Sequence, residues 1–224
     1  IEAAVEACVV LEDDPVFNAG TGSVFRTDGS VHLDASIQTS EGKMGFVIGM
    51  QDTPNPIRVA ADLLDEEING LSGDGARLWA DSKGFERSNV QGRPPFEGAT
   101  DTVGVVARDK SGLIVCATST GGTSNRPPGR VGDVPLPGCG FWVQDGVGVG
   151  ATGIGEAITR GMISLRVADR ILDGNGLEES MMWALDECLE EDAEVGIIAL
   201  GTEGTGHGVS NSTNMPWASW IARK

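Results

Sequence analysis

The chain has 224 residues, of which 40% are hydrophobic and 22% charged, and its formal net charge is −17. This length accommodates one large domain that folds without disulfides or bound metal. The acidic excess argues against nucleic acid and membrane surfaces as partners, and the lack of an apolar run of about eighteen residues argues against a membrane-spanning helix.

The first half of the chain predicts a helix, a glycine-rich loop and several short strands. Apolar residues at helical spacing predict an α-helix over residues 1–11, which the acidic stretch 12–14 and Pro15 end. A glycine-rich loop follows over 17–23. The remaining elements expected in this half are strands over 23–26, 31–37 and 44–49, and helices over 56–64 and 75–81.

The segment 84–101 shows no periodicity and contains Pro94 and Pro95. An irregular run of this length inside a compact domain is usually functional or disordered, and such segments are preferred sites of proteolysis. We therefore expect a cleavable linker here, followed directly by a strand that begins at Thr102.

The second half predicts a β-hairpin, a pair of helices and further strands. The hairpin has strands over 102–107 and 113–118, joined by Asp109-Lys110-Ser111-Gly112. The remaining elements expected are strands over 146–152 and 195–200, helices over 157–172 and 177–190, and a final strand pair over 207–221. Runs of strands separated by runs of helices predict an α+β fold, with antiparallel sheets and helices packed outside them.

Most familiar catalytic and cofactor motifs are absent from the sequence. The run Gly148–Gly153 matches the dinucleotide fingerprint, but a second helix follows it where a Rossmann unit needs a second parallel strand. Only His32 and His207 could join the scattered cysteines around a metal ion, and neither histidine is next to an obvious nucleophile. We therefore expect no cofactor, no metal site and no Ser-His-Asp triad.

A threonine nucleophile works without histidine. If the chain is cut before Thr102, this residue gains an α-amino group with a pKa of about 7.7–8, well below that of lysine. A useful fraction of the amine is then neutral at physiological pH and can accept the proton of the threonine hydroxyl. Composition alone leaves this role open, because threonine at the start of a strand also simply favours β geometry.

Several stretches, in a fixed order, carry a family resemblance. They are Phe17-Asn18-Ala19-Gly20-Thr21-Gly22-Ser23, Asp34-Ala35-Ser36-Ile37, Asp101-Thr102-Val103-Gly104, Thr118-Ser119-Thr120-Gly121-Gly122, Gly129-Arg130-Val131-Gly132-Asp133, Ala151-Thr152-Gly153-Ile154-Gly155-Glu156 and Asn214-Met215-Pro216-Trp217. Together they resemble the family of plant-type asparaginases, isoaspartyl peptidases and glycosylasparaginases. The resemblance implies a four-layer αββα sandwich of the Ntn-hydrolase type, a single domain over 1–224, and autoproteolysis into an α-subunit (1–101) and a β-subunit (102–224).

The resemblance also assigns catalytic residues. Thr102 is similar to the family nucleophile, with Asp101–Thr102 as the bond that is cut, and Thr120 is similar to the threonine that hydrogen-bonds the nucleophile. Thr152 and the Gly153 N–H resemble the oxyanion hole, in which the loss of one donor typically costs about 2.7–4 kcal/mol in the transition state.

Substrate-binding residues follow from the same resemblance. Arg130 and Asp133 resemble the pair that clamps the α-carboxylate and the α-amino group of the substrate, since a guanidinium fork suits a carboxylate and an aspartate suits an ammonium. Asn18 resembles the residue beneath the nucleophile. In some members the loop that corresponds to Leu11 to Thr21 wraps a structural sodium.

The resemblance implies a self-cleaving amidohydrolase for L-asparagine or β-aspartyl (isoaspartyl) peptides, assembled as a homodimer of processed αβ units. Asp101 before the nucleophile is closer to glycosylasparaginases, which keeps glycosylated asparagine open as a substrate. A taspase-like endopeptidase is a second alternative, although such members carry a neutral residue in place of Asp133.

One departure from the family supports a third alternative. The family normally opens with a glycine-rich strand before its first helix, and this sequence begins without it, either as a fragment of a longer chain or because the strand is absent. A member that does not process itself and acts as a binding protein is therefore also consistent with the sequence. In every case we expect a cytoplasmic protein with a small-molecule ligand and without nucleic-acid or membrane partners.

Overall fold

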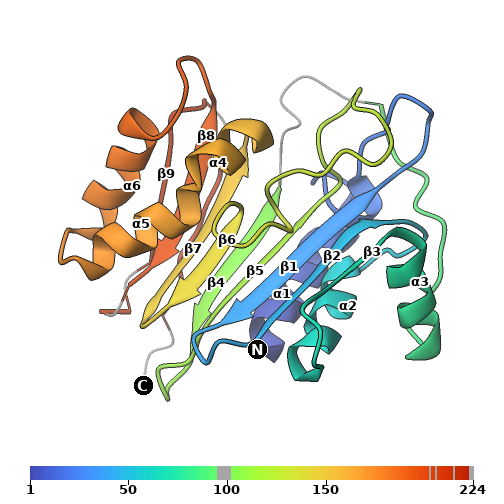
Figure 1. The fold of residues 1–224 in the computed structure, drawn as a ribbon, viewed down its shortest axis with the longest axis horizontal. Coiled ribbons are helices and arrows are strands. Elements are labelled where there is room, and N and C mark those ends of the chain that lie inside the picture. The colour runs from blue at the N-terminus through green and yellow to red at the C-terminus, as the bar shows by residue number, and fades with distance from the viewer. Residues whose placement is uncertain (95–101, 202, 205, 214, 222–224) are drawn as a thin grey trace.

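The computed structural model describes residues 1–94, 102–201, 203–204, 206–213 and 215–221. Within these ranges the chain forms two β-sheets with helices around them (Figure 1). The protein is therefore of the mixed α+β class that its sequence predicts. None of the helices in the described ranges combines the length and the apolar character needed to cross a membrane.

The first sheet has five strands in the order β3-β2-β1-β5-β4. They are β1 (Leu33–Thr39), β2 (Met44–Met50), β3 (Gly70–Ser72), β4 (Val103–Arg108) and β5 (Ile114–Thr120). All neighbours are antiparallel except β2 and β3. The helices on this side are α1 (Glu2–Asp13), α2 (Pro56–Asp62) and α3 (Gly73–Ser82). Helix α1 packs on β4 and β5, and α2 packs on β1 and β2 (Figure 1).

The second sheet is antiparallel and has four strands in the order β6-β7-β8-β9. They are β6 (Phe141–Gln144), β7 (Val147–Gly153), β8 (Val195–Leu200) and β9 (Gly206–Ser210). The helices of this half are α4 (Gly155–Gly161), α5 (Ile163–Leu172) and α6 (Leu177–Glu187). Helix α5 packs on β6 and β7, and α6 packs on β8 and β9 (Figure 1).

The two sheets pack against each other through β1, β4 and β5 on one side and β6 and β7 on the other. Apolar side chains buried between them are Ile114, Cys116, Phe141 and Val143. The Gln38 side chain joins the sheets, because its Nε2 donates to the Val143 carbonyl at 3.1 Å and its Oε1 accepts from the Val143 N–H at 3.0 Å. The sheets are thereby fixed relative to each other, and a site built from both can be rigid.

The hairpin of β4 and β5 places Thr102 beside Thr120. Val103 pairs with Ser119, so the residue before β4 falls opposite the last residue of β5. Strand β5 also pairs with β1, in a register that places Asp34 opposite Thr120. Thr102, Thr120 and Asp34 therefore meet at one end of the first sheet.

Residues 23–26 do not form the strand that their sequence predicts. Val24 makes a single parallel bridge to Arg93, in the segment after α3. The Arg93 N–H donates to the Ser23 carbonyl at 2.9 Å, and the Arg93 carbonyl accepts from the Phe25 N–H at 3.3 Å. Of the expected linker, the residues around Arg93 thus pair with the end of the glycine-rich loop, whereas its beginning contacts Arg77 and Asp52. Its remainder, 95–101, lies outside the described residues.

The helix predicted over 157–172 is two helices. Met162, with φ +45° and ψ +49°, ends α4 and begins α5 in a left-handed conformation. The preceding Gly161 packs so closely on the Cys188 carbonyl that a Cβ would lie 2.7 Å from its oxygen. Strands β3 and β6 are additional to the prediction, and of the final strand pair expected over 207–221 only β9 forms within the described residues.

Glu12 is fully buried, although its sequence position predicts only the end of a helix. Its Oε1 accepts the N–H of Ile57 in the first turn of α2 at 3.2 Å. Burial raises the pKa of Glu12 to about 8, while its hydrogen bonds act in the opposite direction. The folded protein therefore holds a proton here that the unfolded chain, with a glutamate pKa of about 4.3, releases at much lower pH.

We expect Glu12 to make the folded state less stable as the pH rises from 5 to 8. In this range the folded state binds more protons than the unfolded chain, so the free energy of unfolding falls, by on the order of 4 kcal/mol in total. Urea unfolding at pH 5 and pH 8 measures this change. The free energy of unfolding should differ less between the two pH values in Glu12→Gln than in the parent protein. Both proteins should carry Thr102→Ala, so that the cleavage expected from the sequence cannot affect the comparison, and equal pH dependence would contradict the expectation.

Candidate active site

A cavity of about 80 Å³ brings together residues from distant parts of the chain. Most of the site residues expected from the sequence line it: Asn18, Thr102, Thr120, Arg130, Asp133 and Gly153. The other lining residues are Gly122, Thr123, Ser124, Gly132 and Ile154. The cavity therefore combines the end of the first sheet, the end of β7 and the loop between β5 and β6.

Thr102 and Thr120 are joined by a hydrogen bond. The Thr102 Oγ1 donates to the Thr120 Oγ1 at 3.2 Å. The Thr120 Oγ1 also accepts the Gly122 N–H at 3.0 Å and faces the Asn18 carbonyl at 3.5 Å. Thr120 is buried, whereas Thr102 is half-buried at the cavity. The arrangement fixes the Thr102 hydroxyl and leaves it accessible from the cavity.

Asn18 holds the glycine-rich loop against the end of β5. Its Nδ2 donates to the Gly122 carbonyl at 2.6 Å, and its Oδ1 accepts the Val24 N–H at 3.1 Å. The Asn18 carbonyl accepts the Gly121 N–H at 2.8 Å. Because Asn18 is buried and uses both ends of its amide on backbone groups, it supports the site from beneath.

Arg130 is held at the cavity by Glu156, in the first turn of α4. The Arg130 Nε donates to Oε1 at 3.1 Å and its Nη2 donates to Oε2 at 3.0 Å. Gly155 makes this contact possible, because a Cβ there would lie 2.7 Å from Arg130 Nη2 and 2.8 Å from Asp133 Oδ1. A two-pronged pair of this kind fixes the plane of the guanidinium, which suits it to bind a carboxylate.

Asp133 is buried in the cavity wall, and its Oδ2 has no hydrogen-bond partner within the described part of the chain. Burial raises the pKa of Asp133 to about 7. The charges of Asp34 and Glu156 act in the same direction, whereas a backbone N–H and Arg130 act against it. A buried carboxylate with an unused oxygen gains most from a cationic ligand, so an ammonium group suits this position.

Gly153 ends β7 at the cavity in a conformation that favours glycine, with φ +129°. A Cβ at this position would also collide with the carbonyl oxygen of Glu194. Thr152 precedes it, opposite Gly196 in β8, and is half-buried but outside the cavity lining. Asp101, the other half of the expected cleavage site, lies outside the described residues.

The glycines of the glycine-rich loop pack closely on backbone carbonyl oxygens. A Cβ on Gly20 would lie 2.6 Å from the Glu12 carbonyl oxygen, and one on Gly22 would lie 2.7 Å from that of Pro15. Oxygen donors of this kind suit a hard cation such as sodium. In the described ranges, no group of three or more His, Cys, Asp or Glu side chains could hold a metal ion.

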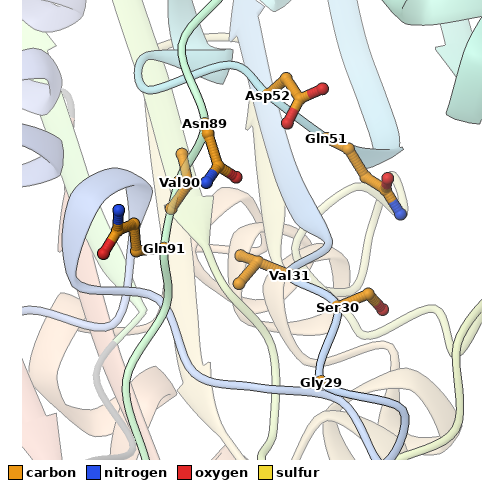
Figure 2. Close-up of a pocket in the computed structure, with 8 residues that line it drawn as sticks. All are labelled: Gly29, Ser30, Val31, Gln51, Asp52, Asn89, Val90 and Gln91. Atoms are coloured by element: carbon orange, nitrogen blue, oxygen red, sulfur yellow. The ribbon is translucent and has the colours of Figure 1, made fainter.

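A larger cavity, of about 330 Å³, lies elsewhere on the first half of the chain. Figure 2 shows the turn 29–31, the residues after β2 and the segment 89–91 around it. Its polar lining consists of amide, hydroxyl and backbone groups with Asp52 as the charged side chain, and it contains no paired nucleophile and base. The chemistry expected from the sequence therefore belongs to the smaller cavity.

Two acidic residues near the smaller cavity, Glu156 and Asp34, have no role in the sequence-based prediction. Glu156 stands in one of the family-like motifs, but its pairing with Arg130 depends on how α4 packs against the loop. Asp34 also stands in such a motif, and its place opposite Thr120 follows from strand register. Ile154, which follows Gly153, adds an exposed apolar side chain to the cavity lining.

Comparison with known proteins points to the same chemistry. The model of the asparaginase family matches residues 1–93 and 91–224. A plant-type L-asparaginase from Pyrobaculum calidifontis is 39% identical over 196 residues, which cover 75% of this chain and 65% of that protein. Proteins named isoaspartyl peptidase/L-asparaginase from Synechocystis sp. and Bos taurus are 32% and 34% identical, over 91% and 98% of this chain and 70% and 79% of their own lengths. The chain thus spans somewhat less than two thirds of the Pyrobaculum protein and more of the other two.

Proposed function

Because this chain belongs to the asparaginase family, we propose that it is a self-cleaving amidohydrolase for L-asparagine or β-aspartyl peptides, with Thr102 as its nucleophile. The observation that carries this proposal is the hydrogen bond of 3.2 Å from Thr102 to Thr120, at a cavity that Arg130 and Asp133 also line. The activities by which the relatives are named support the same class of substrate.

Self-cleavage starts from the intact chain. The Thr102 hydroxyl attacks the carbonyl carbon of Asp101, the peptide C–N bond breaks, and the Thr102 nitrogen takes up a proton as an ester forms on the Thr102 oxygen. Water then hydrolyses the ester, which leaves a carboxylate on Asp101 and a free amine on Thr102. The products are the two pieces 1–101 and 102–224.

Turnover uses the same hydroxyl with the new amine as its base. The neutral amine of Thr102 accepts the hydroxyl proton as the oxygen attacks the side-chain amide carbon of the substrate. Thr152 and the Gly153 N–H stabilise the oxyanion, and the leaving nitrogen takes the proton from the Thr102 amine. The C–N bond breaks as the acyl ester forms, which releases ammonia or a peptide amine. Water then hydrolyses this ester, so that L-aspartate leaves and the Thr102 hydroxyl is regenerated.

The substrate head group is placed by the charged residues of the cavity. Arg130, oriented by Glu156, binds the α-carboxylate, and the unused oxygen of Asp133 accepts the α-ammonium group. A ligand that carries both charges can therefore pair with both side chains at once. This requirement favours a free amino-acid head over an internal peptide segment, and so favours an asparaginase or isoaspartyl peptidase over an endopeptidase.

The expected architecture is part of the same proposal. We infer the four-layer αββα order of the Ntn hydrolases for the single domain 1–224, supported by the packing of α1 and α2 on one sheet and of α5 and α6 on the other. We also infer that two processed αβ units form a homodimer. Carbonyl oxygens of the loop from Leu11 to Thr21 would hold a sodium ion, whose role would be to stiffen the loop beneath Thr120.

The proposal is tested by resolving the purified protein on a denaturing gel and sequencing the new terminus. Two pieces, one of which begins at Thr102, are expected. Release of ammonia or amine is then measured with L-asparagine, a β-aspartyl dipeptide and a glycosylated asparagine, with an endopeptidase substrate as a fourth arm. A chain that stays intact and hydrolyses none of these would instead support the binding-protein alternative.

We expect the KM for L-asparagine to fall as the pH rises from 6 to 8. With a pKa of about 7, Asp133 is mostly protonated at pH 6 and mostly ionised at pH 8, and only the ionised form binds an ammonium group strongly. The ionised fraction changes about tenfold over this range, and KM should fall by a similar factor. Steady-state kinetics at constant ionic strength measure the change, and a KM that is independent of pH would argue against contact between Asp133 and the substrate.

A further inference from the structure

Arg26 is a buried cation that the proposed reaction does not use. It follows the glycine-rich loop and is only 2% exposed. Its Nη1 donates to the Thr123 carbonyl at 3.1 Å, and its Nη2 donates to the His32 carbonyl at 3.3 Å. A guanidinium removed from water in this way is retained only where neighbouring charges and carbonyl groups compensate for its lost hydration.

The compensating charge is Asp34, at the start of β1. Asp34 is fully buried, and its Oδ1 accepts the Gly49 N–H at 2.8 Å. Burial lowers the pKa of Arg26 and raises that of Asp34 to about 6, and the attraction between the two charges opposes both shifts. Arg26 and Asp34 are therefore two buried charges of opposite sign that attract each other without a direct hydrogen bond between them, and Asp34 lies opposite Thr120 of the candidate site.

Arg26 also touches the cavity wall. Gly122 has φ +74°, and a Cβ on it would lie 2.6 Å from both Nη atoms of Arg26, so the guanidinium packs directly on this residue. The Gly122 N–H donates to Thr120 at 3.0 Å, and its carbonyl accepts from Asn18 at 2.6 Å. Gly122 and Thr123 both line the cavity. A single side chain thus contacts one lining residue and hydrogen-bonds the next.

We propose that Arg26, with Asp34 as its counter-ion, is a positioning residue that holds the wall formed by Gly122 and Thr123 in the shape that binds the amino-acid head group. Arg26 acts through this wall, because its guanidinium is buried behind Gly122. The inference rests on the proposed function. Its expected signature is a loss of substrate affinity with a smaller change in kcat, since the hydrogen bonds of Arg26 go to the Thr123 and His32 carbonyls and not to Thr102, Thr152 or Gly153, the groups assigned to the chemical steps.

The test compares Arg26→Met with a matched control, Arg77→Met. Arg77 is also buried and also donates to backbone carbonyls, those of Asp52, Phe85 and Glu86. It is not among the residues that line the cavity around Thr102. We expect Arg26→Met to raise KM for L-asparagine at least tenfold while kcat changes less than threefold. Binding of L-aspartate, measured by calorimetry, should weaken by a similar factor. Arg77→Met should lower the melting temperature and leave KM and L-aspartate affinity unchanged.

Two further variants separate positioning from stability. Arg26→Met combined with Asp34→Asn removes both buried charges, so it should recover thermal stability and keep the high KM, because the contact with Gly122 is still missing. Arg26→Lys keeps the charge without the two-pronged fork and should give an intermediate KM; it replaces Arg26→Met in the test if that variant does not fold.

Three outcomes would overturn the inference. The first is an unchanged KM in Arg26→Met, or in Arg26→Lys if only that variant folds. The second is a KM that the double substitution restores to the wild-type value. The third is an equal rise of KM in Arg77→Met. An active wild-type enzyme with one of these results overturns only the role of Arg26. A wild-type protein that hydrolyses none of the substrates overturns the proposed function, and this inference with it.

Discussion

Replacing Thr102 with alanine is expected to abolish self-cleavage and to lower amide hydrolysis by at least about 10⁴-fold, the scale seen when a nucleophile that works with its base as a unit is removed. The alanine has no hydroxyl to attack either carbonyl, and without the cut no α-amine is present to accept a proton. The measurement is intact mass after prolonged incubation, together with ammonia release from L-asparagine.

Two controls show whether the loss is chemical. Thr102→Ser restores a hydroxyl and should retain slower cleavage and turnover. Thr118→Val changes a threonine in β5, whose hydroxyl contacts Ser36 at 2.6 Å rather than Thr102, and should affect stability more than cleavage. Full activity of Thr102→Ala would refute the threonine mechanism.

Replacing Arg130 with methionine is expected to raise KM for L-asparagine roughly 30-fold, since losing the partner of a hydrogen-bonded charge that the bound substrate shields from water costs about 2 kcal/mol or more. The substrate carboxylate then has no fork to bind, and Glu156 loses its partner. Self-cleavage should persist in this variant, because the α-carboxyl group of Asp101 is still in its peptide bond and so offers Arg130 no α-carboxylate to bind. KM from initial rates and the fraction of cleaved chain measure the two effects separately.

The matched control for Arg130 is Arg160→Met, in the same short helix as Glu156. Arg160 pairs with Glu190 at 2.6 Å, and both side chains are more than half exposed, so the loss of this pair should leave KM unchanged. An Arg130→Met enzyme with the KM of the wild type would remove Arg130 from the substrate site and would shift attention to the other polar groups of the cavity.

Much of the fold could be predicted because its signals are local. The hairpin of β4 and β5 carries alternating β-rich residues on both sides of a turn that Asp109 closes, with its Oδ1 accepting the Ser111 N–H at 2.8 Å. Strand β8 is an apolar run whose length matches one strand. Residues 23–26 have the sequence pattern of a strand by the same rules, but within the described residues their β-pairing is a single bridge to Arg93, far along the chain.

The features of the candidate site likewise fall into those that the sequence could predict and those that it could not. Thr102 could be assigned from its place at the start of a strand and from family-like motifs, and the structure adds its bond to Thr120. The pairing of Arg130 with Glu156 could not, because it depends on the packing of α4 against a loop 26 residues earlier in the chain. The burial of Glu12 was equally hidden, since an acidic residue at a helix end ordinarily faces solvent.

The pairing of β1 with β5 joins the two pieces that the proposed cut would produce. Strand β1 precedes Thr102 in the chain and β5 follows it, yet they pair from Asp34 opposite Thr120 to Thr39 opposite Val115 in the middle of one sheet. Helix α1, from before the cut, also covers β4 and β5. Neither piece could therefore assemble its share of this sheet alone, and halves produced separately should not reconstitute an enzyme. The proposed cleavage would then follow folding. The rate at which the two pieces appear on a gel would therefore set a lower limit on the rate at which the native state forms.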